Sequence, residues 1–237
     1  MARRLEGDPM PSSFSYAALC QSPTGDLPRT VAGVLLNDAA ALAALGDAVN
    51  QPPYKAPPRA PVLYIKPANT YAADGDAIAL PADADTVVVG ACLGIVFGRQ
   101  ARRVDAGRAL EYVAGYRIVA DLYVPHASYY RPAIKQKCRD GFCPMGPVVP
   151  RGQVADPDDL DIQVSVDGQV VQQASTRNWV RPAARLIADV TRFMTLEAGD
   201  VLLAGIPAGE PQARAGQQYE ISIGALGRLA NRLVAAR

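Results

Sequence analysis

The sequence lacks the features that define several classes of protein. Its formal net charge is only +1 over 237 residues, so the chain as a whole has no field suited to nucleic acid or an anionic membrane surface. No apolar run approaches the roughly 20 residues needed to span a bilayer. The arginines near the start precede no continuous apolar segment of the kind that secretory signals contain. We therefore expect a cytoplasmic protein that has neither nucleic acid nor a membrane as a partner.

Cysteine and histidine are scarce. The chain has four cysteines and one histidine, and only Cys138 and Cys143 lie near one another, whereas structural zinc normally takes several closely spaced ligands. Cys143 lies in the apolar stretch GFCPMGP, where a thiol is most often a small buried hydrophobic residue. The spacing forms no dense disulfide framework, so we expect reduced thiols and no zinc–thiolate site.

Strand patterns dominate what is present. Apolar residues make up 49% of the chain, which is enough for a sizeable core. The clearest local pattern is LDIQVSVDGQVVQQAS (160–175), whose alternation and central Asp167-Gly168 pair are typical of a two-residue hairpin. Further strand-like segments are separated by turns, without a regular alternation of strands and helices. The sequence therefore predicts a mainly β (α+β) domain with helices on its flank.

Two segments have helical patterns. The Ala/Leu-rich segment 38–50 follows a polar capping residue, and 181–194 has a proline near its first turn. The second segment places apolar residues on one face, which indicates a helix packed on the core. This face consists of Leu186, Ile187, Val190, Phe193 and Met194. A proline-rich connector after the first segment excludes helix and central strand, and we predict an N-terminal extension or lid over 1–52 and a main domain over 53–237.

Positive charge is concentrated in the stretch YYRPAIKQKCRDGFCPMGP (129–147). Its cations are Arg131, Lys135, Lys137 and Arg139. In one interpretation they form an anion clamp, because arginine binds carboxylates bidentately and lysine adds a mobile charge, with Asp140 orienting one of the cations. In the other, they form a solvated basic loop paired with surface acids, which contributes little. Charge spacing alone favours the solvated loop.

Several motifs occur in an order that resembles the fumarylacetoacetate hydrolase family, from about position 54 onward. They are YIKPANTYAADGDAIALP, GIVFGR, GYRIVADL, KCRDGFCPMGP, VDGQ with QQASTRNW, and LEAGDVLLAGIP. Two longer segments, QPPYKAPPRAPVLYIKPANT and YYRPAIKQKCRDGFCPMG, resemble the N-terminal half, or separate N-terminal subunit, of the bifunctional isomerase/decarboxylases of homoprotocatechuate (4-hydroxyphenylacetate) degradation. The resemblance implies the mixed β-roll, with flanking helices, of the family's C-terminal domain.

The resemblance also implies an enzyme, a carboxy-lyase and/or isomerase whose substrate is a small molecule with several carboxylates. Members of this group remove CO2 from 5-oxopent-3-ene-1,2,5-tricarboxylate and isomerise the 2-hydroxyhepta-2,4-diene-1,7-dioate that results. Both steps build an enolate of a 2-oxo acid, whose oxyanion a hard cation, Mg2+ or Mn2+, stabilises in the family. Two alternatives stay open: a non-catalytic partner of a metal-bearing sibling, and a hydrolase for another acylpyruvate-type substrate.

The family holds its cation with a Glu-x-Glu pair on one strand and an aspartate on a neighbouring strand. The aspartate position matches Asp121, but Gly90 and Cys92 occupy the glutamate positions, and Ile206 replaces a threonine that faces the substrate. The resemblance therefore implies an incomplete metal site in this chain, which glutamates at positions 90 and 92 should improve. It also implies a homodimer, or a heterodimer with a sibling subunit of the C-terminal type.

Individual roles follow from the same resemblance. Lys137 matches a catalytic lysine that contacts the substrate carboxylate or oxyanion, and Lys66 and Thr176 match residues near the family's substrate. The alternative for Lys66 is an edge-strand charge, and a threonine in the position of Thr176 more often caps or hydrogen-bonds locally. His126 lies on an expected loop after Asp121, where it is either a proton carrier in catalysis or a polar loop residue.

Overall fold

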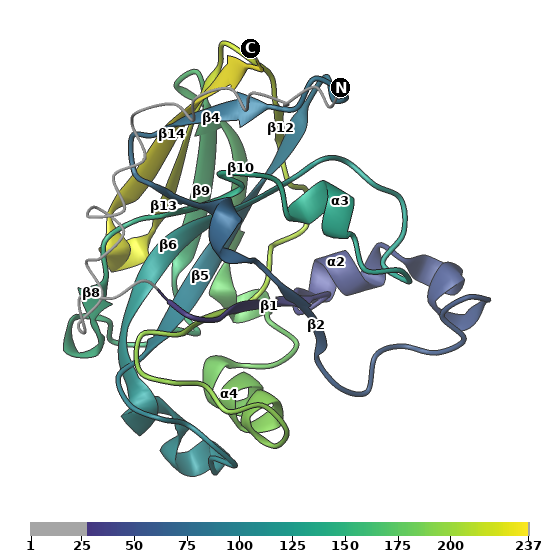
Figure 1. Cartoon of the computed structure of the whole chain (residues 1–237). Helices are drawn as coiled ribbons and strands as arrows, with labels where there is room; N and C mark the ends of the chain where they lie inside the picture. Colours follow the sequence, from purple (N-terminus) through teal and green to yellow (C-terminus); the bar gives the residue numbers. More distant parts are fainter. Residues whose placement is uncertain (1–27, 237) are drawn as a thin grey trace, which may run out of the picture.

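The computed structural model describes residues 28–236. Two β-sheets are the main regular structure in this part of the chain, and short helices lie at their edges (Figure 1). This architecture confirms the predicted mainly β class. In the same range no helix is long and apolar enough to cross a bilayer.

The larger sheet has nine strands within the residues described. Its hydrogen-bonded path runs β2-β1-β11-β5-β6-β7-β3, while β12 pairs with β5 and β8 with β6. The strands are β1 (Val31–Leu35), β2 (Val62–Ile65), β3 (Tyr71–Ala73), β5 (Val87–Phe97), β6 (Val113–Tyr123), β7 (Cys143–Met145), β8 (Val149–Pro150), β11 (Val201–Leu203) and β12 (Gln212–Ala213). The path places β5 and β6 near the middle of the sheet.

The sequences of β5 and β6 explain this central position. All eleven residues of β5 are buried, as expected for the apolar, valine-rich run VVVGACLGIVF covered on both faces. The strands pair antiparallel, with Gly90 opposite Asp121 and Cys92 opposite Val119. Because alternate residues share a face, these four positions lie on one side of the sheet. That side packs a small apolar cluster, and the opposite side packs the main core.

The smaller sheet contains the hairpin that the sequence predicted. Its order is β10-β9-β13-β14-β4, with β4 (Ala77–Leu80), β9 (Asp161–Val166), β10 (Gln169–Ser175), β13 (Gln218–Ile223) and β14 (Arg228–Ala235). Between β9 and β10, Asp167 and Gly168 have φ values of 48° and 78°. Positive φ at both central residues is the geometry of a type I′ turn, so the predicted hairpin is confirmed.

The helices are shorter than the patterns indicated. The predicted helix 38–50 divides into α2 (Ala39–Ala43), capped by Asp38, and the 3₁₀ helix η1 (Gly46–Asn50). The remaining helices are α3 (Ile134–Lys137) and α4 (Ala183–Thr191), with 3₁₀ helices η2 (Ala68–Thr70), η3 (Ala106–Tyr112), η4 (Arg151–Gln153), η5 (Thr176–Asn178) and η6 (Gly224–Leu226). Because α4 ends at Thr191, Phe193 leaves the predicted core face and is 71% exposed.

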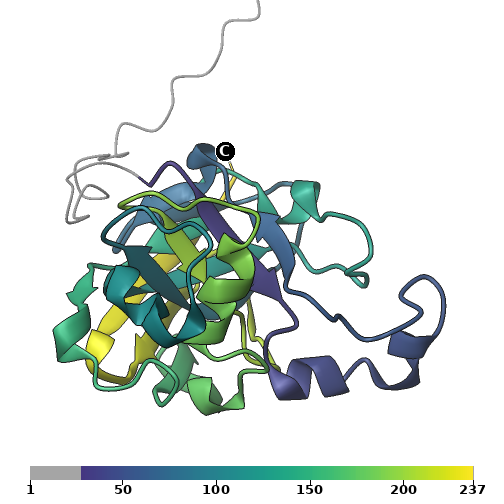
Figure 2. The ribbon, with the colours of Figure 1, turned by 90° about the horizontal axis from the view of Figure 1, so that it is seen from below.

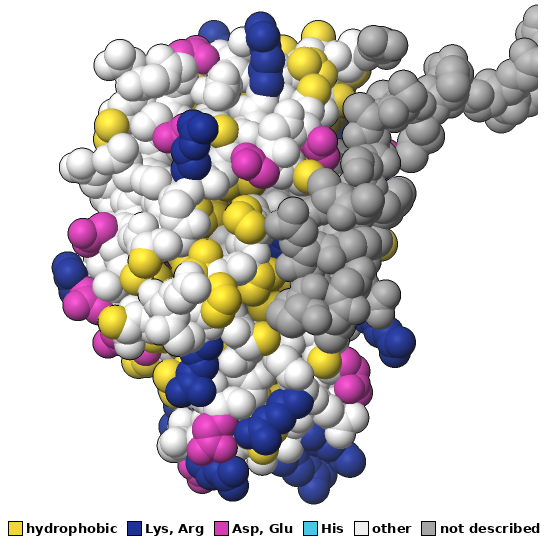
Figure 3. Space-filling model, turned by 90° about the vertical axis from the view of Figure 1, so that its left-hand side faces the viewer, with side chains coloured by type: hydrophobic (Ala, Val, Ile, Leu, Met, Phe, Trp, Pro, Cys, Tyr) yellow, Lys and Arg dark blue, Asp and Glu magenta, His cyan; other side chains and the backbone are white. Residues whose placement is uncertain are grey.

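The predicted extension 1–52 is described only from residue 28. Within it, β1 lies between β2 and β11, so this strand belongs to the main sheet instead of an appended lid. Figure 2 shows the segment that follows α2 projecting from the body before it returns as β2. On the face drawn in Figure 3, Lys and Arg side chains are interspersed with Asp and Glu side chains, in keeping with the small net charge.

Candidate anion-binding site

Asp121 lies at the centre of a buried cluster of charges. It is fully buried on β6, near the end of the strand. Two lysines that are far apart in sequence approach its two carboxylate oxygens: Lys66 Nζ is 2.6 Å from Oδ1, and Lys137 Nζ is 2.8 Å from Oδ2. Burial alone would raise the pKa of Asp121, but the two lysines outweigh burial and lower it to about 2. Asp121 is therefore an anion at neutral pH.

Lys66 joins three backbone segments beneath the site. It directly follows β2, and its ammonium donates to the carbonyl oxygens of Leu122, Lys137 and Phe142 at 2.8, 2.8 and 2.9 Å. These bonds use the three N–H groups of an ammonium, so the close contact with Asp121 is ionic and Oδ1 receives no hydrogen bond within residues 28–236. Lys66 was predicted to bind substrate, but it is 1% exposed and lies outside the pocket lining.

Lys137 connects the buried cluster with a pocket. It is the last residue of α3, and its ammonium lies over the rings of Tyr64 and Tyr123, 4.5 and 4.1 Å from their centroids. Burial lowers the pKa of Lys137 more than the neighbouring Asp121 raises it. The aspartate and the two rings nevertheless favour the ammonium form. Lys137 thus presents a partly desolvated cation at the pocket wall.

Tyr64 completes the cluster from the opposite side. Its hydroxyl donates to Asp121 Oδ2 at 2.5 Å, and burial, followed by the charge of Asp121, raises the pKa of the phenol well above 10. Tyr64 lies opposite Gly33 in the β1–β2 ladder. A Cβ atom at Gly33 would lie within 2.2 Å of the tyrosine ring, so only glycine lets the ring lie flat across β1.

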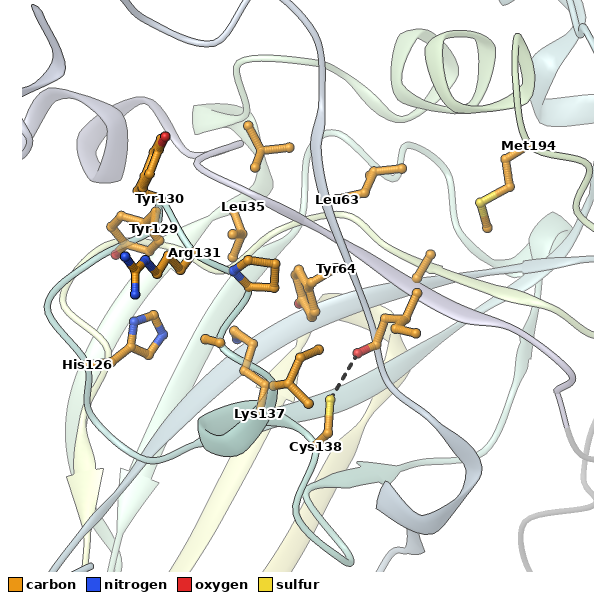
Figure 4. Close-up of a pocket in the computed structure, with 16 residues that line it drawn as sticks. Leu35, Leu63, Tyr64, His126, Tyr129, Tyr130, Arg131, Lys137, Cys138 and Met194 are labelled. Atoms are coloured by element: carbon orange, nitrogen blue, oxygen red, sulfur yellow. Dashed lines mark hydrogen bonds between the residues drawn. The ribbon is translucent and has the colours of Figure 1, made fainter. Parts of the chain in front are cut away.

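The pocket above this cluster has a volume of about 330 Å3. Its polar lining comes from Lys137, Arg131 and His126 together with tyrosines 64, 129 and 130, and apolar side chains form most of the remaining wall. Figure 4 shows these residues arriving from β2, from the loop before α3 and from α3 itself. A concave apolar site with a few convergent polar groups is the usual form of a small-molecule site.

His126 occupies the loop end of the pocket as a neutral imidazole. Its Nδ1 lies 3.0 Å from the carbonyl oxygen of Ser128, which assigns the ring proton to Nδ1 because a carbonyl only accepts. Nε2 is buried and has no partner within residues 28–236. Burial, together with the charge of Lys137, lowers the pKa of His126 despite the opposing hydrogen bond. Nε2 is thus available as a proton acceptor.

The four cations of the basic segment lie in two different places in the structure. Arg131 and Lys137 line the pocket, whereas Lys135 and Arg139 both bind Asp83 on the surface, at 3.1 and 2.9 Å. The solvated-loop interpretation therefore holds for two of the four cations, and the segment is not a single clamp. Of these four cations only Lys135 and Lys137 belong to α3, and they point to different sides because residues two apart on a helix lie more than half a turn from one another.

Two other predicted residues lie away from the pocket. Asp140 accepts a hydrogen bond from Asn69 Nδ2 at 2.7 Å and forms no ion pair within the range described, so it does not orient a cation there. Thr176 is buried, and its hydroxyl accepts from the backbone N–H of Leu160 at 2.8 Å. This contact joins residues 16 positions apart, and the capping residue of η5 is Ser175, whose side chain accepts from the backbone N–H of Arg177. Thr176 therefore has a structural role, but not that of a local cap.

Sequence reasoning missed three residues near Lys137: Tyr64, Tyr123 and Glu210. Tyr123 donates to Glu210 Oε1 at 3.4 Å, and burial raises the pKa of the Glu210 carboxyl. Tyr64 had a usable signal, because residues two apart in an extended segment share a side and Lys66 follows at that spacing. Glu210 had no such signal, since it lies far from the other residues in sequence.

The residues at the family's metal position do not fit a divalent cation. A Cβ at Gly90 would lie 2.7 Å from Ile206 Cδ1 and 2.8 Å from the carbonyl oxygen of Asp121. Cys92 is fully buried, burial raises the pKa of its thiol, and its Sγ donates to the carbonyl oxygen of Gly205 at 3.0 Å. Within residues 28–236 no three His, Cys, Asp or Glu side chains cluster suitably for a metal. Glutamates at 90 and 92, predicted to improve the site, therefore lack room at Gly90.

The fold and the site define a class of protein. Residues 30–234 match the fumarylacetoacetate (FAA) hydrolase C-terminal family, and the chain belongs to this family. It is 39% identical over 206 residues to the 4-hydroxyphenylacetate degradation bifunctional isomerase/decarboxylase of Salmonella dublin, a match that covers 87% of this chain and 47% of the relative. The chain thus spans about half the length of that relative, and its predicted correspondence to the N-terminal half stays a prediction.

Solved structures of similar proteins have the same fold as this chain. The 5-carboxymethyl-2-hydroxymuconate delta-isomerase of Mycobacterium smegmatis is 32% identical, with a TM-score of 0.77 and coverage of 89% of this chain and 80% of that one. The fumarylpyruvate hydrolase of Pseudomonas aeruginosa, solved with Mn2+ and pyruvate, is 25% identical, with a TM-score of 0.77 and coverage of 88% and 91%. A divalent metal therefore occurs in the family, and isomerases and hydrolases share this fold.

Proposed function

We propose that this chain is an isomerase and/or decarboxylase subunit of the homoprotocatechuate pathway, and that its pocket stabilises the enolate of a 2-oxo acid through Lys137. The observation that carries this proposal is the position of the Lys137 ammonium, which Asp121 holds on one side and which lines the pocket on the other. A preorganised cation at low dielectric stabilises a developing oxyanion strongly because it needs no reorganisation during the reaction. The substrates of such relatives are anions, which this charge attracts.

Each group then has a role in the isomerisation of 2-hydroxyhepta-2,4-diene-1,7-dioate. The 2-hydroxyl group loses its proton to His126 Nε2, and Lys137 stabilises the resulting dienolate oxygen. His126 then returns the proton to carbon 5 of the diene, which leaves a 2-oxo acid with one double bond, between carbons 3 and 4, and no net change in protons. Tyr64 and Asp121 hold the lysine ammonium in place, and Arg131 binds the second carboxylate.

No step in this scheme uses a cation bound to this chain, because Gly90, Cys92 and Ile206 leave no site for one. The same observation favours a second candidate function. In that case the chain is a non-catalytic subunit, and a sibling with the complete Glu-x-Glu pair performs the chemistry with Mg2+ or Mn2+. The two candidates differ in what the isolated chain does.

The test is an ultraviolet assay of dienedioate loss with the isolated chain, with and without EDTA. We expect activity that resists EDTA and falls about 100-fold in kcat/KM in Lys137→Met, as is typical when a charged catalytic group is lost. Lys135→Met is the matched control, because Lys135 binds only Asp83 on the surface, and it should change kcat/KM less than about twofold. Silence of the isolated chain with activity restored by the sibling would establish the second candidate instead.

A further inference from the structure

The pocket holds positive charge at one end only. Lys137 and Arg131 line it, while Lys135 and Arg139 bind Asp83 on the surface. Lys137 already has an anionic partner beneath the pocket, and Arg131 forms no ion pair with residues in the range 28–236. This arrangement provides charge for one or two carboxylates, which is too little for a ligand anionic along its whole length.

The rest of the wall is apolar. Figure 4 shows Leu63 and Met194 lying away from His126 and Arg131, on the opposite side of the view. The main apolar contributors are Leu35, Leu63, Pro132, Ala133, Ile134 and Met194. Leu63 and Met194 also pack against the main core, so this end of the pocket is anchored to the body of the protein.

The pocket also exceeds the needs of a small, fully polar acid. A four-carbon dicarboxylate would leave much of the 330 Å3 to water in contact with apolar walls, which is unfavourable. An apolar group of the ligand would displace that water and gain roughly 25 cal/mol for each Å2 of apolar surface buried. The rings of Tyr64, Tyr129 and Tyr130 line the same space and offer edge and face contacts to an aromatic group.

We propose that this pocket binds 2-oxo acids that carry an aromatic or branched aliphatic group at the end remote from the 2-oxo carboxylate. The 2-oxo carboxylate binds at Lys137, and the apolar group extends toward Leu63 and Met194, away from Arg131. This inference rests on the proposed function, because it uses the same anchor at Lys137, and it extends the ligand class beyond dienedioates.

Calorimetric titration of the full chain with phenylpyruvate and with oxaloacetate tests the proposal. These probes share the 2-oxo carboxylate head and differ in having a phenyl ring or a second carboxylate. We expect phenylpyruvate to bind at least about tenfold more tightly, since one ring buries enough apolar area for that difference. Leu63→Asp should reduce phenylpyruvate affinity about tenfold and leave oxaloacetate affinity within about twofold.

Val170→Asp is the matched control, because Val170 is 51% exposed on β10, outside the pocket, and both affinities should be unchanged. Should Leu63→Asp fail to fold by circular dichroism, Met194→Gln makes the same comparison from the far wall. Equal or weaker binding of phenylpyruvate, or an equal loss of both ligands in the wall variants, overturns the proposal. Turnover of the dienedioate is measured separately: turnover without phenylpyruvate preference refutes only this inference, and phenylpyruvate binding without turnover refutes only the proposed function.

Discussion

Two aspartates in this protein each bind two cations, with very different surroundings. Asp121 contacts Lys66 and Lys137 in the interior, where all three side chains are at most 4% exposed. Asp83 contacts Lys135 and Arg139 at the surface, where the Lys135 side chain is 74% exposed. The cations of both clusters include members of one short basic segment. The comparison shows that the local density of charge in a sequence does not reveal which charges act together.

The physical consequences of the two clusters differ because of solvent. The pKa of Asp83 is lowered by hydrogen bonds from Arg139 and Lys135, but water and salt screen such surface pairs. The carboxylate of Asp121 has lost its water, and the two ammonium groups replace it. Buried ion pairs add little net stability when intact, whereas removing one partner is costly. Only the buried cluster therefore constrains both folding and chemistry.

The largest expected effect comes from removing the buried carboxylate. Asp121→Asn leaves Lys66 and Lys137 in the interior without a counter-ion, and we expect it to lower the free energy of unfolding by about 3–5 kcal/mol. Urea denaturation followed by circular dichroism measures the change. Asp83→Asn is the matched control and should leave the urea midpoint unchanged in 0.15 M salt. Equal midpoints for the two variants would contradict the distinction between the clusters.

The second-largest expected effect is a loss of stability in acid that depends on the buried Asp121. The folded pKa of Asp121, about 2, lies below its ordinary value of 3.8, so its ionised form stabilises the fold above pH 4. This contribution, about 2 kcal/mol, is lost as the pH falls from about 4 to about 2. Unfolding measured across that range, in 0.1 and 1 M salt, should show a loss that salt does not remove. Asp121→Asn should lack this component, and an unchanged acid profile in that variant would assign the loss to other carboxyls.

The smallest expected effect concerns the strand opposite Asp121. Gly90→Ala places a Cβ against the Ile206 side chain and the carbonyl oxygen of Asp121, and we expect a loss of about 1–2 kcal/mol. Adding Ile206→Val should restore part of that loss, because it relieves only the side-chain contact. Thermal unfolding of the single and double variants measures both steps. Gly152→Ala is the control, since a Cβ there meets nothing within 4 Å.

Much of the fold could be predicted from local patterns. Alternation and a turn-forming pair specified the hairpin of β9 and β10, because both signals depend on neighbours in sequence. The end of α4 could not be predicted in the same way. Phe193 and Met194 continue the apolar periodicity, yet the helix ends at Thr191, whose buried hydroxyl accepts from the backbone N–H of Val104. That contact joins residues 87 positions apart, which a local pattern does not contain.

The candidate site, like the fold, has features that the sequence predicted and features that only the folded chain reveals. Motif resemblance identified Lys137 and Asp121, and the structure pairs them. Distinguishing Lys137 from Lys135 required the course of α3 and the position of Asp83, which lies 56 residues from Arg139. Likewise, the Lys66 motif was recognised, but its role depends on carbonyl groups from three segments that meet only in the folded chain.

The three carbonyl groups bound by Lys66 determine which part of the pocket can adapt to a ligand. One side chain fixes the backbone at the end of β6, at the end of α3 and just before β7, so the floor of the pocket is set before any ligand arrives. The part of the pocket that can change to accept new ligands is then the exposed loop that carries Tyr130 and Arg131. Changes there can alter the shape of the ligand that is accepted without moving the cation that receives its charge.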